Sequence, residues 1–121
     1  MFKNLALWSA FFIALIMASV PAKADFISGD QLRLYCTSQD PNDDAICVVY
    51  ITGAFDALTS MDQLAITTSN APPQFCPSDD IGPEELKQIT LAYLQRPETN
   101  LDFGASLLVW AAARNSFGCD K

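Results

Sequence analysis

The residues able to do chemistry in this 121-residue chain are carboxylates and cysteines, because the sequence contains no histidine. A chain without histidine can build neither a Ser-His-Asp triad nor a Cys-His pair. Adjacent carboxylates occur at Asp79 and Asp80 and again at Glu84 and Glu85. A glycosidase needs two carboxylates that face each other across a cleft, whereas neighbours in a turn or at a helix start are typical of solvated groups. We therefore predict that the protein is not an enzyme.

The sequence also gives no support for a metal ion or a cofactor. The five glycines are scattered and form no phosphate-binding loop, and the acidic residues do not follow the EF-hand spacing. No two cysteines have the C-x-x-C spacing of a zinc site or a thioredoxin-type redox motif. We expect the protein to work without a cofactor.

The first 24 residues have the pattern of a cleaved export signal. Lys3 supplies a positive charge, residues 5–20 form an apolar run, and Ala22–Ala24 has the small-x-small pattern of a signal peptidase site. We therefore expect residues 1–24 to be removed. Residues 25–121 would then form a single exported domain that leaves the membrane after cleavage. A retained membrane anchor is the alternative.

All four cysteines lie in the predicted mature chain, at Cys36, Cys47, Cys76 and Cys119. An even number of cysteines in a small exported chain indicates a disulfide framework, and four cysteines allow three pairings. The predicted mature chain has 97 residues (121 − 24). A chain of this size buries only roughly 60–65% of its unfolded surface. Its thin core therefore needs support from cross-links or from a partner.

The predicted mature chain is strongly acidic. Without Lys3 and Lys23 it keeps five basic and fourteen acidic residues, a net charge of −9 (5 − 14). Such a surface repels phosphate backbones, so nucleic acid is not an expected partner. It favours a basic protein partner through electrostatic steering, although solubility alone also explains an acidic surface.

Hydrophobic periodicity predicts an all-α domain, a compact bundle of about four helices stapled by two disulfides. A short first helix spans residues 28–38, and a second runs from Asp44 to about Ala65. Prolines and acidic residues mark a third helix within residues 82–98, and residues 100–117 form the fourth. Residues 66–82 separate the second and third helices as a long loop.

This order of helices favours one of the three disulfide pairings. Cys36 ends the first helix and Cys47 lies in the first turn of the second, so a helical hairpin brings them together. Cys76 precedes the third helix and Cys119 follows the fourth, so antiparallel packing brings these two together. We predict Cys36–Cys47 and Cys76–Cys119, each contributing about 2–4 kcal/mol to stability.

The second helix is apolar almost all round, which predicts a central, buried position. The face that we expect to be most buried comprises six residues: Ile46, Tyr50, Gly53, Ala57, Met61 and Leu64. Four more residues cover much of the neighbouring face: Cys47, Ile51, Phe55 and Leu58. Glycine inside a helix costs about 1 kcal/mol relative to alanine. We expect Gly53 and Ala57 to repay that cost by letting another helix backbone approach closely.

A narrow polar strip on the same helix contains Thr52, Asp56, Thr59 and Gln63. Asp56 has a structural and a functional interpretation. In the structural one it is a solvated member of this strip or a hydrogen-bond partner to a neighbouring helix end. In the functional one it is an acidic contact to a partner protein or to a second copy of the chain.

The long loop is our main candidate for partner contact. Residues 66–82 contain three prolines and no periodicity. An irregular segment of this length in a compact domain is often a binding loop. Cys76 would pin its far end, and a pinned loop loses less entropy on binding. We predict partner contacts at Asn70, Gln74 and Phe75, together with Asp56.

Several motifs in order resemble a known family. The stretches are GDQLRLYC, CVVYITGAFDAL, FCPSDDIGPEELKQI, AYLQRPE and GASLLVWAAARNSFGC. They resemble the Tai/Rap family of type VI secretion immunity proteins, in which Tai stands for type VI amidase immunity. The family pattern C-x-x-Y-x-x-G-x-x-D falls on Cys47, Tyr50, Gly53 and Asp56. The family's terminal Phe-Pro-Cys is residues 117–119 here, with glycine in place of proline.

The resemblance implies a small, helical, periplasmic protein that is often dimeric. Such a protein binds a toxic peptidoglycan-cleaving effector of the amidase type, blocks its active site and prevents self-intoxication. Two alternatives remain. A small acid-stress chaperone is also exported, helical and disulfide-linked, and it would expose apolar surface to unfolded clients in acid. An orphan family member would serve another contact in the cell envelope.

Overall fold

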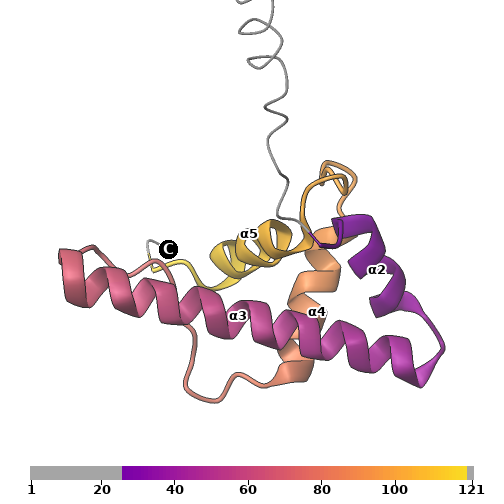
Figure 1. The fold of residues 1–121 in the computed structure, drawn as a ribbon, viewed down its shortest axis with the longest axis horizontal. Helices are drawn as coiled ribbons and strands as arrows, with labels where there is room; N and C mark the ends of the chain where they lie inside the picture. Colours follow the sequence, from indigo (N-terminus) through magenta and orange to yellow (C-terminus); the bar gives the residue numbers. More distant parts are fainter. Residues whose placement is uncertain (1–25, 120–121) are drawn as a thin grey trace, which may run out of the picture.

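The structure is a computed structural model in which residues 26–119 are described. Within these residues there are four helices: α2 (Gly29–Thr37), α3 (Pro41–Ser69), α4 (Pro83–Leu94) and α5 (Ala105–Phe117) (Figure 1). The predicted all-α fold is confirmed. The predicted export signal lies outside the described residues.

The longest helix, α3, is the spine of the bundle. It has 29 residues and packs against each of the other three helices. Figure 1 shows α3 running the length of the domain, with α4 crossing it and α2 folded back at one end. The side of α3 that faces these helices contains Cys47, Ile51 and Phe55, all of which are buried. The domain therefore has one core, built along one side of one helix.

Both ends of α3 lie outside the predicted bounds, Asp44 to about Ala65. Pro41 occupies the first helical turn, where its missing N–H is not needed, and the Asp40 side chain caps the helix. The helix then continues to Ser69. It stops where Asn70 adopts the left-handed conformation, with a φ of 53°. Pro41 and the Asp40 cap therefore start the helix before the predicted Asp44.

The prediction of which α3 face is buried is wrong. Ile46, Met61 and Leu64 were expected inside, yet they are 45%, 63% and 52% exposed. Gly53 and Ala57 are exposed as well. A Cβ on Gly53 would meet no atom within 4 Å, so no other helix of this chain approaches there. Periodicity found two adjacent apolar faces, and the disulfide at the start of α3 turns the other one inward.

Tyr50 lies at the border between the two apolar faces of α3. It is half-buried and packs against the core. A structural role for Tyr50 in packing is consistent with this position, whereas Gly53 and Ala57 have no such contact to the core.

The start of α2 is fastened to the start of α5. The Gly29 N–H donates to the Phe103 carbonyl at 2.8 Å, and the Ala105 N–H donates to the Ile27 carbonyl at 2.9 Å. These bonds align the two helix starts. Leu32 on α2 is fully buried, and α2 packs against both α3 and α5. The segment before α2 thus closes one end of the bundle.

The third and fourth predicted helices are present with shorter bounds. α5 begins at Ala105 because residues 100–103 form a turn, in which the Asn100 side chain accepts from the Asp102 N–H at 3.0 Å. Leu108 on α5 is buried, whereas its neighbour Leu107 is 49% exposed.

One ion pair joins α4 to α3. Lys87 donates a hydrogen bond to the Asp44 carboxylate in the first turn of α3. This hydrogen bond raises the pKa of Lys87 above its usual value. The pair joins α4 to the first turn of α3.

Both predicted disulfides are confirmed, and they differ in their surroundings. Cys36–Cys47 joins α2 to α3 and is buried in the core. Cys76–Cys119 joins the long loop to the segment after α5, 43 residues later. Cys76 is exposed and Cys119 is half-buried. The first disulfide therefore belongs to the core and the second to the surface.

Two glycines provide a matched test of this packing. A Cβ on Gly29 would overlap the Leu108 side chain and lie 3.1 Å from the Leu101 carbonyl oxygen. Gly29→Ala should therefore lower the free energy of unfolding by about 1–3 kcal/mol. Gly53→Ala places its methyl group in open space and should raise that free energy by about 0.5–1 kcal/mol. Urea denaturation at low protein concentration measures both, and effects of the same sign would contradict the packing described.

Candidate functional site

The candidate site is the segment Asn70–Cys76, which we call the pinned loop. It leaves the end of α3 and turns back over that helix toward the end of α5 (Figure 1). Asn70, Pro72, Pro73 and Gln74 are exposed. The left-handed Asn70 starts the reversal, and the two prolines restrict the backbone that follows it.

A buried carboxylate on α3 holds the backbone of the pinned loop. Both oxygens of Asp62 accept from the Gln74 N–H at 3.0 Å, and one also accepts from the Phe75 N–H at 3.3 Å. Asp62 is 8% exposed, and a carboxylate so placed needs hydrogen bonds to offset its lost hydration. Our sequence analysis missed this residue. Phe55, Leu58 and Asp62 follow the helical spacing i, i+3, i+7, and this pattern places Asp62 on the core side of α3.

A second set of contacts joins the pinned loop to the end of α5. The Gln74 carbonyl accepts from Arg114 Nη1 at 2.8 Å and from the Cys119 N–H at 3.4 Å. The Cys76 N–H donates to the Phe117 carbonyl at 2.7 Å. The Cys76–Cys119 disulfide closes the same junction. The loop is thus held by α3 on one side and by the chain end on the other.

The structure places Phe75 inside the domain and not on the surface expected for a partner contact. It is 8% exposed. Its ring meets Phe55 edge to face with 6.3 Å between centroids, and Phe55 meets Phe117 in the same way at 6.0 Å. Phe75 therefore anchors the pinned loop in the core. The predicted contact residues with exposed side chains in this segment are Asn70 and Gln74.

A shallow groove of about 370 Å³ follows the pinned loop, lined by Pro72, Pro73, Gln74, Arg114 and Cys119. Prolines and a disulfide give it stiff, largely apolar walls beside a guanidinium group. Within residues 26–119, no group of three or more His, Cys, Asp or Glu side chains is placed to hold a metal ion. The groove is suited to contact with a protein surface.

Among the described residues, no recorded contact joins Asp56 to the pinned loop. It is exposed on α3, in the polar strip predicted from the sequence. The neighbouring Thr52 and Thr59 hydroxyls donate to carbonyls of their own helix, at 2.7 Å and 3.0 Å. Asn70, Gln74 and Phe75 thus belong to the pinned loop, whereas Asp56 is an exposed residue of α3.

An apolar surface runs along the outside of α3. We call it the α3 stripe, and it comprises Ile46, Val49, Gly53, Ala57, Met61 and Leu64. Beside it, Leu58 of α3 and Leu107 and Trp110 of α5 line an open hollow of about 400 Å³. By length and composition alone, α3 is the one described helix that could cross a membrane. The stripe contributes to that hydropathy, while the opposite face of the helix forms the core.

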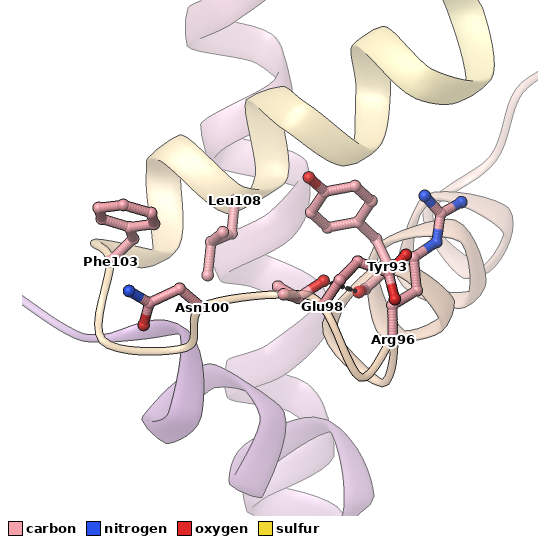
Figure 2. A pocket seen from close by; sticks show the side chains of 7 residues that line it. Tyr93, Arg96, Glu98, Asn100, Phe103 and Leu108 are labelled. Carbon is pink, nitrogen blue, oxygen red and sulfur yellow. Dashed lines mark hydrogen bonds between the residues drawn. The ribbon is translucent and has the colours of Figure 1, made fainter.

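A small pocket of about 220 Å³ lies where α4 connects to α5. Figure 2 shows Tyr93, Arg96 and Glu98 on one side, with Asn100, Phe103 and Leu108 facing them. The Arg96 guanidinium lies over the Tyr93 ring, 4.9 Å from its centroid. The Thr99 hydroxyl donates to the Tyr93 carbonyl at 2.8 Å. These contacts stabilise the connection, which accounts for the polar side chains around the pocket.

The comparison with protein families identifies the chain. The family model of the Rap1a immunity proteins matches residues 28–119, which include the four helices, both disulfides and the pinned loop. This chain belongs to the Rap1a immunity protein family. No curated protein matches it in sequence. Membership in the Rap1a family indicates a protein that gives immunity to a type VI effector by binding it, and it favours an inhibitor over an enzyme.

The two disulfides of this Rap1a family member should differ in their sensitivity to reductants. In the Cys76–Cys119 disulfide, Cys76 is exposed and Cys119 is half-buried, whereas Cys36 and Cys47 are both buried. Mild reduction of the folded protein should therefore open the surface disulfide first. Alkylation followed by mass spectrometry measures the order of opening. Labelling of Cys36 and Cys47 at the same rate as the surface pair would contradict the assignment.

Proposed function

We propose that this protein is a periplasmic inhibitor of a peptidoglycan-cleaving, amidase-type effector delivered by type VI secretion. Family membership supports binding to a secreted effector. The predicted export signal supports the periplasm, where such an effector reaches the cell wall. The observation that carries the proposal is the pinned loop. It is an exposed segment whose backbone is bonded to both α3 and the chain end.

Inhibition by such a loop needs no catalytic group in the inhibitor. A stiff segment can fill the cleft of an enzyme and exclude substrate from it. Because the pinned loop is already ordered, its binding avoids much of the entropy that a mobile loop would lose. Pro72 and Pro73 also lack backbone N–H groups, so their burial in a cleft leaves no donor without a partner.

The charge of the domain suits a basic effector. Asp79, Asp80, Glu84 and Glu85 are exposed in the stretch that follows the pinned loop and begins α4. Together with the net charge of −9 expected for residues 25–121, they give the partner-facing region a negative potential. Opposite charge on the effector would speed association and orient the encounter.

Binding and inhibition should depend on the pinned loop. We expect oxidised protein comprising residues 25–121 to bind a type VI amidase tightly in calorimetry and to stop its hydrolysis of peptidoglycan. Gln74→Ala and Asn70→Gly should each weaken binding by about tenfold if their side chains lie at the centre of the contact. Glycine keeps the left-handed backbone at position 70, so only the side chain is tested.

The matched control is Gln95→Ala, which removes an exposed glutamine at the end of α4 and should leave binding unchanged. Full affinity in both loop variants would exclude the loop as the contact surface. No binding to a broad panel of type VI amidases would favour the chaperone or the orphan interpretation over the inhibitor.

We also propose that the protein forms a homodimer through the α3 stripe. The six stripe residues carry no charge, although the chain as a whole is strongly acidic. Two copies of an acidic chain repel each other least across an uncharged surface. Gly53 and Ala57 at its middle leave room for a close approach. An antiparallel crossing there would place the Ile46 end of one stripe against the Leu64 end of the other, as two-fold symmetry requires.

A single charge on the stripe should separate the dimer. Val49 is 70% exposed, so Val49→Glu adds a carboxylate without disturbing the core. Sedimentation equilibrium should show wild-type dimer and Val49→Glu monomer, because the dimer would bury each new carboxylate in an apolar interface without a partner. The control is Leu34→Glu, at an equally apolar, exposed position on α2, which should stay dimeric. A monomeric wild type, or a dimer in all three proteins, would contradict the assignment.

A further inference from the structure

We infer that Asp62 is a positioning residue for effector binding, because its carboxylate sets the conformation of the pinned loop before the effector arrives. The inference rests on the proposed function, since it explains how the pinned loop is kept ready to bind. Asp62 is not itself expected to touch the effector, because its side chain is buried beneath the loop.

The hydrogen bonds of Asp62 point to this role. All three that the structure records for its carboxylate come from backbone N–H groups of the pinned loop. Asp62 occupies a core position of α3, where an apolar side chain would pack without the cost of desolvating a charge. The carboxylate is therefore explained by what it binds, which is the backbone of Gln74 and Phe75.

The location of these bonds along the loop also supports a positioning role for Asp62. At the far end of the loop, the disulfide and the Phe117 carbonyl hold Cys76, while Arg114 Nη1 and the Cys119 N–H donate to the Gln74 carbonyl. The end of α3 holds the loop at Asn70. Asp62 adds the bonds to the N–H groups of Gln74 and Phe75, directly after the exposed prolines. Without it, the residues presented to the effector would have more backbone freedom to lose on binding.

A positioning role and a purely structural role make different predictions. Removing a buried carboxylate also removes hydrogen bonds, so Asp62→Ala will lower stability in either case. If Asp62 only stabilises the fold, any variant of equal stability should bind the effector equally well. If Asp62 positions the loop, its loss should weaken binding beyond what stability explains.

The test compares Asp62→Ala with a core variant of similar stability, Val109→Ala, at a temperature where both are folded. Val109 is buried on α5. The probe is the type VI amidase that wild type inhibits most strongly. Asp62→Ala should raise Kd at least about tenfold, while Val109→Ala should stay within about twofold. Asp62→Asn, which keeps one acceptor oxygen, should fall between them. Equal loss in Asp62→Ala and Val109→Ala would overturn the inference.

A second measurement needs no effector. Amide hydrogen exchange of the free protein reports how often the Gln74 and Phe75 N–H groups open. Asp62→Ala should speed exchange at both by about tenfold or more relative to Val109→Ala. Unchanged exchange would overturn the positioning role even for a protein that inhibits. If wild type binds no amidase, the proposed function fails, whereas the exchange result still decides whether Asp62 orders the loop.

Discussion

The rest of the structure depends on the buried side of α3, where Phe55 joins three segments that are distant in the sequence. Its ring contacts Phe75 from the pinned loop and Phe117 from the end of α5. The same side of the helix holds Cys47, which ties α2 to the core, and Asp62, which binds the loop backbone. A small domain buries little surface, and here one helix packs against each of the other three described helices to build the core.

The position of each residue on α3 then determines its use. Residues on the inner side form the core, and the last of them binds the loop that we propose enters the effector. Residues on the opposite apolar side form the α3 stripe, which we propose meets a second copy. The polar strip, with Asp56, remains in solvent. Packing and partner binding thus use separate sides of one helix, and a change on one side need not disturb the other.

The sequence predicted the helices because local patterns such as caps and prolines specify them over a few residues. Both disulfides followed from the order of those helices, and the family motifs added the immunity function. The sequence did not predict which apolar side of α3 is buried, since Ile46 and Cys47 belong to faces of similar hydrophobicity. For the same reason the sequence did not reveal Asp62, because its role depends on where the loop returns to α3. We also predicted Phe75 as a partner contact, whereas its side chain packs in the core. Long-range packing decides these features.

The central claim is that the pinned loop meets the effector without changing shape. A crystal structure of the protein with an amidase effector tests this most directly. We predict that residues 70–76 lie in the effector's cleft, with the Asp62 bonds to Gln74 and Phe75 intact. A complex in which the effector covers another surface and leaves the pinned loop in solvent would contradict the account. So would a loop that releases Asp62 on binding.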